Sequence, residues 1–196
     1  SDGSYLEGQD MFHMSGLHRD VYLYATPAVA VRDHYITAAL AAPSYTSGTL
    51  SVAMTLDNRE RRAGTKQVEV ALISPEGETV ATQTASVDYA ASALEKDFSV
   101  EIPVSGLTLW TAETPVLYTV AIRQMNESEA EEMVFSTRYG FRDVRISDGV
   151  VLINGKRVFF KGVNTQDTHP LRGRSIDVET MLKDIVLMKQ ANVNTV

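Results

Sequence analysis

The chain contains no cysteine, which excludes disulfide bonds and thiolate metal sites but does not fix a cellular compartment. It also lacks any apolar run of the length that a helix needs to cross a bilayer. Its 18 basic residues are outnumbered by 25 acidic ones and are scattered along the sequence, so they form no concentrated basic stretch of the kind that binds nucleic acid. We therefore expect a globular protein without a membrane span or a nucleic-acid partner.

The residues that are present have an ordinary composition for such a protein. Of the 196 residues, 44% are hydrophobic and 22% are charged. The first residue is Ser1, so any signal peptide would precede the given sequence. The expected localisation therefore stays open between the cytoplasm and the periplasm.

Short strands separated by turn residues dominate the middle of the chain. Residues 51–56 and 67–72 alternate between apolar and polar or small side chains, a period typical of half-buried antiparallel strands. The expected strands are 32–40, 48–57, 66–73, 79–87, 95–102, 116–125 and 131–142. About seven strands in roughly 115 residues is the pattern of an immunoglobulin-like β-sandwich, here without the cysteine pair of antibody domains.

The last third of the chain has a different pattern. Asp148-Gly149 and Asn154-Gly155 are tight-turn dipeptides, because these residues tolerate the positive φ that short turns need. Two apolar runs, 150–153 and 157–163, are predicted to be strands, the second covered on both faces. A polar loop over 164–174 follows the second strand.

A helix is expected after this loop. Asp177 is suited to be its N-cap, and apolar residues recur from Val178 to Met188 at spacings of three and four, which gives one face for packing on a sheet. Asn192 is a suitable stop, and residues 194–196 look like the beginning of another strand. This order makes one β/α unit, and β/α barrels carry functional groups on the loops after their strands. Because one unit cannot close a barrel, we expect the chain to be an internal piece of a larger protein.

Both ends of the chain resemble one known family. GFRDVRISDGVVLINGKRVFFKGVN at 140–164, HPL at 169–171 and LMKQANVNTV at 187–196 are similar to the entry to the catalytic barrel of glycoside hydrolase family two. That family includes β-galactosidases, β-glucuronidases and β-mannosidases. Residues 3–23 are similar to the segment of large bacterial β-galactosidases in which an acidic residue, followed by Met and an aromatic residue, reaches the sugar site.

The resemblance implies three parts and a mainly β fold. Residues 1–28 would be the C-terminal tail of a jelly-roll sugar-binding-like domain. Residues 29–145 would be the immunoglobulin-like β-sandwich. Residues 146–196 would be the truncated start of a (β/α)8 TIM barrel, with its first β/α unit.

The resemblance also implies residues that bind substrate. Asp10 matches an aspartate that approaches the galactosyl hydroxyls and helps to ligate a sodium ion in related β-galactosidases. His169 matches a histidine that lines the galactose pocket and hydrogen-bonds sugar hydroxyls, and Asn164 is retained in the same loop. Judged on residue type alone, polar loops of this kind are more often simply solvated.

The chain departs from the family pattern in both of these segments. His13 stands where relatives often have arginine and Phe12 replaces a tryptophan, so no role is assigned to His13. Residues 165–167 replace a more basic, histidine-rich run. The exact sugar preference therefore stays open.

Both catalytic carboxylates are expected to be absent from the chain. Retaining hydrolysis needs an acid/base and a nucleophile about 5–5.5 Å apart. By resemblance both glutamates belong to later barrel strands beyond Val196, and the following residues do not match their motifs: Glu7, Glu60, Glu113 and Glu179. The chain alone is therefore expected to be inactive, with no cofactor of its own. A magnesium site in the longer protein would likewise use residues absent here.

Other functions remain open at this stage. The longer protein would be a homo-oligomeric β-galactosidase acting on terminal β-galactosides with retention, and β-glucuronidase and β-mannosidase are alternatives. A non-catalytic sandwich module for interaction or carbohydrate binding belongs to a second class. Because an uncovered apolar helix face is costly in water, residues beyond about 155 are expected to be disordered or to self-associate in isolation.

The single tryptophan, Trp110, also has two interpretations. An aromatic ring beside a proline-bounded loop is suited to stacking on a sugar. Packing of Trp110 and Tyr118 at the edge of the sandwich is the favoured alternative. Tyr139, Phe141 and Arg142 are likewise expected to form a seam between domains rather than a site.

Overall fold

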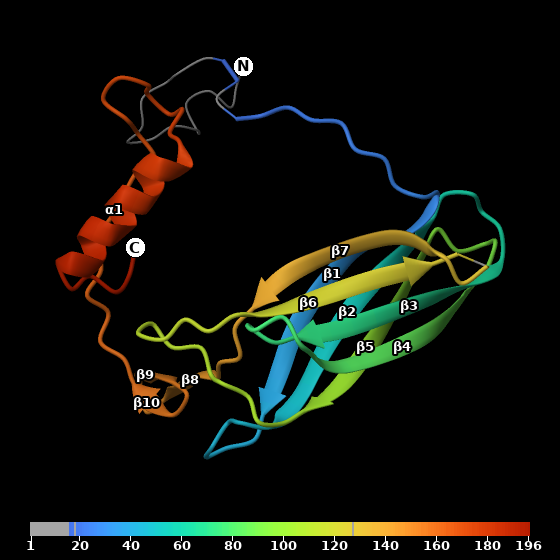
Figure 1. Cartoon of the computed structure of the whole chain (residues 1–196), viewed down its shortest axis with the longest axis horizontal. Helices are drawn as coiled ribbons and strands as arrows, with labels where there is room; N and C mark the ends of the chain where they lie inside the picture. Colours follow the sequence, from blue (N-terminus) through green and yellow to red (C-terminus); the bar gives the residue numbers. More distant parts are fainter. Residues whose placement is uncertain (1–15, 18, 127) are drawn as a thin grey trace. The chain divides into compact units, whose positions relative to one another are not determined.

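The structure is a computed structural model that describes residues 16–17, 19–126 and 128–196 (Figure 1). These residues form two compact units. The larger unit is Ala25–Val158. The smaller unit joins Phe159–Val196 to the described part of the N-terminal segment that ends at Tyr24.

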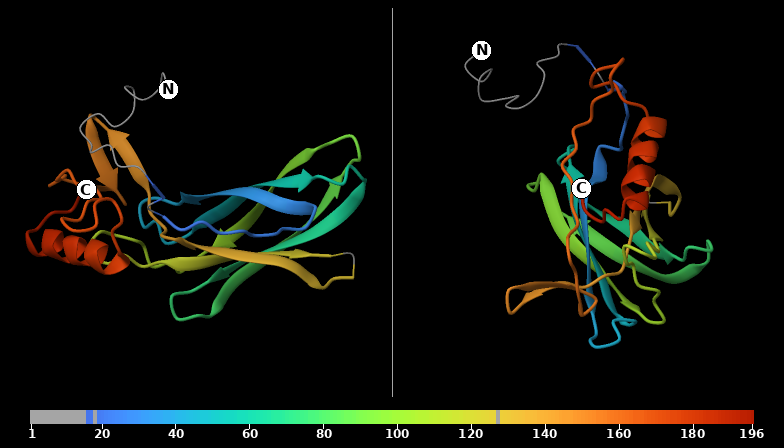
Figure 2. Two further views of the ribbon diagram at one scale, coloured as in Figure 1. Left: turned by 90° about the horizontal axis from the view of Figure 1, so that it is seen from above. Right: turned by 90° about the vertical axis from the view of Figure 1, so that its left-hand side faces the viewer.

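Seven antiparallel strands among the described residues of the larger unit form two sheets that pack on each other (Figure 2). One sheet has the strand order β1-β2-β5, and the other has the order β4-β3-β6-β7. The strands are β1 (Val29–Leu40), β2 (Gly48–Asn58), β3 (Gly64–Ile73), β4 (Thr79–Tyr89), β5 (Glu95–Val104), β6 (Tyr118–Met125) and β7 (Glu131–Tyr139). Each predicted strand is present with its ends shifted by a few residues, which confirms the sandwich.

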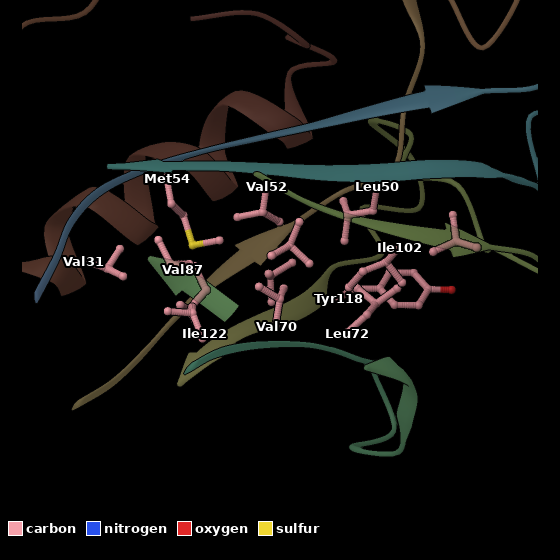
Figure 3. Close-up of a cluster of buried hydrophobic side chains, with 14 of the residues drawn as sticks. Val31, Leu50, Val52, Met54, Val70, Leu72, Val87, Ile102, Tyr118 and Ile122 are labelled. Carbon is pink, nitrogen blue, oxygen red and sulfur yellow. The ribbon is translucent and has the colours of Figure 1, made fainter. Parts of the chain in front are cut away.

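The hydrophobic core lies between the two sheets and is built from alternate side chains. In β2, Val52, Met54 and Leu56 are buried, whereas Ala53 and Thr55, which alternate with them, are exposed or partly exposed. Figure 3 shows Val52 and Met54 pointing toward Val70 on the opposite sheet. Full burial of a valine or leucine contributes about 1.5–3 kcal/mol. The predicted alternation is therefore also the main source of stability in this unit.

A buried polar link joins the two sheets. Gln124 in β6 accepts a hydrogen bond from the backbone N–H of Val31 (2.9 Å) and donates one to the carbonyl of Val29 (2.8 Å), both in β1. Its amide also donates to Glu132 at 2.9 Å, and Glu132 accepts a second bond at 2.5 Å from the buried ammonium of Lys66. Because burying an unpaired polar group is costly, these bonds allow Gln124 and Lys66 to lie inside the sandwich.

A small three-stranded sheet follows the sandwich. Its strands are β8 (Val144–Ser147), β9 (Val150–Ile153) and β10 (Lys156–Arg157), in the order β10-β9-β8. Asp148-Gly149 has φ values of 50° and 74°, and Asn154-Gly155 has 51° and 74°, as type I′ turns require. Both predicted turns are therefore confirmed.

Helix α1 (Val178–Gln190) is confirmed together with both of its end signals. Asp177 caps the first turn, since its Oδ1 accepts the N–H of Thr180 at 2.9 Å. At the other end Asn192 has a φ of 61°, and its N–H donates to the carbonyl of Lys189 at 3.0 Å. The N–H of Val193 reaches the carbonyl of Met188 at 2.9 Å, which completes a Schellman motif.

The predicted packing of α1 on a sheet is not observed. The helix has no buried residue, and Leu182 and Val186 are 60% and 51% exposed. Val21–Tyr24, in the segment assigned to a jelly-roll domain, belongs to no sheet and has exposed side chains. Its assignment to a jelly-roll domain stays a prediction.

The predicted strand over 157–163 is wrong in extent. Arg157 ends β10, and the rest of the run makes one parallel bridge, between Gly162 and Thr195. Phe159 and Phe160 are 65% and 59% exposed, so the run is not covered on both faces. A parallel ladder needs a partner strand, and residues 194–196 supply only a short one.

A single parallel bridge nevertheless brings Gly162, before the loop, next to Thr195, after α1, as the predicted β/α unit requires. Asn194 holds it on both sides, because its N–H donates to the carbonyl of Lys161 (3.1 Å) and its Oδ1 accepts the N–H of Lys161 (2.7 Å). The described residues include no helix that is long and apolar enough to span a membrane.

Candidate functional site

The polar loop that leads from the parallel pairing into α1 is the candidate site, and it can be followed in orange and red in Figure 1. The loop begins at Asn164, directly after Val163, whose N–H pairs with Thr195 at 3.2 Å. It ends at Asp177, the cap of α1. This is the position at which β/α units present functional side chains.

His169 lies in a closed turn within this loop. Its backbone N–H donates to the carbonyl of Gly173 at 2.7 Å, and the N–H of Gly173 returns to the carbonyl of His169 at 2.9 Å. Gly173 has a φ of 61°, a conformation that a residue with a Cβ adopts only at a cost. The backbone of His169 is therefore fixed while its side chain stays partly exposed.

The imidazole of His169 also takes part in the turn. Its Nδ1 accepts a hydrogen bond of 3.1 Å from the backbone N–H of Leu171. A neutral imidazole has one donor and one acceptor nitrogen. Nε2 is therefore the nitrogen that can donate to a ligand.

An ion pair ties the same turn to the start of α1. The guanidinium of Arg172 contacts Asp177 Oδ2, while Asp177 Oδ1 accepts the hydroxyl of Thr180 at 2.6 Å. Hydrogen bonds from the Thr180 side chain and backbone, followed by the bond from Arg172, hold the pKa of Asp177 well below its usual range. The cap therefore stays ionised and braces the turn against the helix.

The N-terminal segment reaches the same loop through Arg19. Its Nη1 donates to the carbonyl of Arg174 at 3.0 Å, and its Nη2 lies 3.9 Å from Asp167. These partners are about 150 residues away in the sequence, so no local pattern indicates the contact. The only hint was that Arg19 lies within residues 3–23, the N-terminal segment that resembles β-galactosidases.

The other two predicted site residues are Asn164 and Asp10, of which the structure describes only Asn164. Asn164 is exposed, and its side chain has no hydrogen-bond partner among the described residues. Asp10 lies outside the described residues, as do His13 and Phe12. Within residues 16–17, 19–126 and 128–196, no group of three or more His, Asp or Glu side chains is placed to hold a metal ion. The sodium interpretation of Asp10 therefore stays a prediction.

Trp110 is a packing residue of the larger unit. The backbone N–H of Trp110 donates to the carbonyl of Phe141 at 2.9 Å, and the backbone carbonyl of Trp110 accepts a hydrogen bond of 3.1 Å from the side-chain amide of Asn154. The guanidinium of Arg142 lies over the ring, 4.5 Å from its centre. Tyr118 is buried in the core. These contacts support the packing interpretation of Trp110 over the sugar-stacking one.

A surface groove of about 610 Å³ opens beside Trp110, and Tyr35, Arg138 and Arg142 contribute to its lining. It lies wholly within the larger unit, along the outer strands β1 and β7. Its lining includes three aromatic rings, those of Tyr35, Trp110 and Tyr139, and two arginines, a chemistry that suits a contact surface. The predicted interdomain seam at this place stays a prediction.

Two family models match the chain, and the boundary between them falls where the sequence pattern changes from that of the sandwich to that of the β/α unit. Residues 29–142 match the family model described as glycosyl hydrolases family 2, and residues 144–196 match the model of that family's TIM barrel domain. The chain belongs to glycosyl hydrolase family 2. The sandwich lies in the part that matches the first model, and the candidate loop lies in the part that matches the barrel model.

Curated family members align along the entire chain. A β-galactosidase from Vibrio cholerae is 39% identical over 202 aligned residues, and one from Yersinia pestis is 36% identical over 208. Each alignment covers 100% of this chain and 19% of the relative. The chain therefore spans about a fifth of the length of the curated relatives it matches.

Solved structures of two other proteins share the fold. A family 2 member from Bacteroides cellulosilyticus superposes with a TM-score of 0.79 at 21% identity, covering 86% of this chain and 23% of that one. A β-glucuronidase from Bacteroides uniformis gives a TM-score of 0.71 at 24% identity, covering 82% and 19%. At these identities the likeness concerns the fold alone.

Proposed function

We propose that this chain works as part of a longer β-galactosidase that hydrolyses terminal β-D-galactosides with retention. The observation that carries the proposal is the alignment of the whole chain with β-galactosidases at 36–39% identity. The match of residues 144–196 to the catalytic barrel supports a hydrolase over a free-standing sandwich module. β-Glucuronidase stays the second candidate, because family members with that name share the fold.

In this proposal the chain contributes substrate binding and not the bond cleavage. His169 is presented on the loop after the parallel pairing, and Asn164 begins that loop with a free amide among the described residues. Asp10 would approach the sugar from the N-terminal segment, which Arg19 attaches to the same loop. The acid/base and the nucleophile of retaining hydrolysis would come from outside this chain.

Ions and assembly belong to the longer protein. A sodium ion near Asp10 and a magnesium ion held by other parts of the enzyme remain proposals, and no step is assigned to either. The longer enzyme would be a homo-oligomer.

The first test concerns the 196-residue chain alone. We expect no turnover of an aryl β-galactoside, because a retaining mechanism needs two carboxylates about 5–5.5 Å apart. Measurable hydrolysis by the purified chain, free of host β-galactosidase, would contradict this division of labour.

The second test places the chain in a complete enzyme. A chimaera in which it replaces the aligned segment of the Vibrio cholerae β-galactosidase should hydrolyse the aryl β-galactoside. His169→Ala in the chimaera should lower kcat/KM by at least about tenfold, the effect of losing a hydrogen bond in a binding site. His34→Ala, in β1 of the sandwich, is the matched control and should leave it unchanged. A folded chimaera that is inactive, or that is indifferent to His169→Ala, would argue against the proposal.

A further inference from the structure

We propose that His169 acts toward its ligand only as a hydrogen-bond donor, through Nε2–H, because the loop itself fixes the imidazole tautomer. The identity of the ligand atom, an oxygen of a sugar hydroxyl that accepts this bond, rests on the proposed function. The tautomer does not, since it follows from contacts within the loop.

The tautomer follows from the partner of Nδ1. The backbone N–H of Leu171 lies 3.1 Å from this nitrogen and can only donate. Nδ1 must therefore carry a lone pair, and the single proton of the neutral ring is on Nε2. In this state the ring offers a donor, and not an acceptor, on the side away from the turn.

The sequence His-Pro-Leu explains why this bond forms. Pro170 has no N–H, so the first backbone donor after His169 is that of Leu171. The fixed φ of proline, about −65°, helps to fold this N–H back toward the side chain two residues earlier, as in Asx-turns. A histidine followed by proline can thus close a turn with its own ring.

The other polar atoms of His169 are also occupied. Its N–H donates to Gly173, and its carbonyl accepts from both Gly173 (2.9 Å) and Arg172 (3.3 Å). Among the described residues Nε2 has no partner. The one polar atom that the turn leaves available is therefore a donor.

The chain contains an internal reference for this effect. The imidazole of His34 packs against Phe135, with ring centres 5.2 Å apart, and its nitrogens have no hydrogen bond among the described residues. Nothing in the structure selects one tautomer of His34. Both histidines can be observed in one sample.

Nitrogen NMR of the ¹⁵N-histidine-labelled 196-residue chain, at a pH above about 8, tests the tautomer directly. His169 should show a protonated Nε2 and an unprotonated Nδ1, whereas His34 should show averaged shifts at both nitrogens. The signals are assigned with the variants His169→Asn and His34→Ala. A protonated Nδ1 or averaged shifts at His169 would overturn the inference.

Two substitutions of His169 distinguish the role of Nδ1 from the role of Nε2. In His169→Asn the amide oxygen can replace Nδ1 and keep the bond from Leu171, but nothing replaces Nε2. In His169→Gln the amide NH₂ can replace the Nε2 donor, but the acceptor for Leu171 is lost. Amide exchange of Leu171 in the chain should therefore stay slow in the Asn variant and become faster in the Gln variant.

Activity in the chimaera should follow the opposite order. We expect kcat/KM of His169→Gln to exceed that of His169→Asn by about tenfold, because the Gln variant keeps the donor that contacts the sugar. Equal activities, or a more active Asn variant, would show that Nδ1 or the turn is what matters. If the unmutated chimaera is inactive, the proposed function fails, and the NMR result still decides the tautomer.

Discussion

At the scale of single residues, Gln124 is the side chain on which the sandwich depends most specifically. It is fully buried and bonds the backbone of β1 from the opposite sheet, at Val29 and Val31. A buried polar group of this kind does not drive collapse. It fixes how the two sheets are aligned, because any shift would leave its amide unpaired.

Replacing Gln124 with alanine should destabilise the chain by about 1–3 kcal/mol, since polar groups of β1 and Glu132 lose their partner inside the sandwich. Urea unfolding followed by circular dichroism measures the change. Gln67→Ala is the control, because Gln67 bonds Ser86 on the exposed face of β3, and its loss should cost no more than about 0.5 kcal/mol. Equal effects of the two substitutions would show that the buried link is unimportant.

Glu132 makes the same link sensitive to acid. Burial alone would raise the pKa of Glu132, but hydrogen bonds from Lys66 and Gln124 and the charges of Lys66 and Arg62 together lower it below its ordinary value of 4.5. A carboxyl with a lower pKa in the folded state stabilises the fold above its unfolded pKa. That stabilisation is lost as the pH falls through the folded value.

The stability difference between the unmodified chain and Glu132→Gln should therefore be largest at neutral pH and should shrink as the pH falls below about 4.5. Urea unfolding at a series of pH values provides the measurement. Glu101→Gln, at an exposed position of β5, serves as the control. A difference that stays constant from neutral to acid pH would be incompatible with an ionised Glu132 in the link.

At the scale of elements, short sequence signals predicted the strands, turns and helix ends that depend on neighbouring residues. The alternation in 51–56 and 67–72 predicted β2 and β3, and the Asp-Gly and Asn-Gly pairs predicted the two turns of the β8–β10 sheet. Asp177 and Asn192 predicted the ends of α1. Each of these signals acts within a few residues.

Contacts between distant residues could not be predicted in this way. Gln124 meets Val29 across 95 residues, and Arg19 meets Arg174 across 155. The local sequence around a glutamine in an apolar strand, or around an arginine in a polar segment, does not indicate which distant residue it will contact. The predicted strand over 157–163 failed for a related reason, since its apolar residues indicate burial but not which segment covers them.

The cap of α1 offers a test at this scale. Asp177→Ala should speed amide exchange of Thr180 and loosen the first turn, because the substitution removes the acceptor for that N–H. It should also disturb the turn at His169, since Arg172 loses its partner. Asp177→Asn keeps an acceptor for Thr180 without the charge, so Thr180 should stay protected while Arg172 becomes mobile. Unchanged exchange in the alanine variant would count against the cap.

At the scale of the whole molecule, the two units differ in how well they are covered. The larger unit has a closed core between its sheets. The smaller unit exposes large apolar side chains on and before its helix, namely Phe159, Phe160, Val178, Leu182, Ile185, Val186 and Leu187. Exposed apolar area of this kind favours association.

We therefore expect the chain to self-associate as its concentration is raised, whereas residues 25–158 alone should remain monomeric. Sedimentation velocity over a range of concentrations distinguishes the two. Leu182→Glu combined with Val186→Glu, which places charges one helical turn apart on α1, should weaken the association without altering the sandwich. Identical sedimentation of the chain and of residues 25–158 at every concentration would remove the smaller unit as its cause.

The central claim is that this chain supplies one part of the substrate site of a longer family 2 hydrolase, and the coding sequence on either side of it tests that claim most directly. We predict that the open reading frame continues beyond Val196 with further β/α units of the barrel, among them the two glutamates that retaining hydrolysis requires. A stop codon immediately after Val196, with no other chain supplying the barrel, would contradict the claim and leave a sandwich module without catalytic groups.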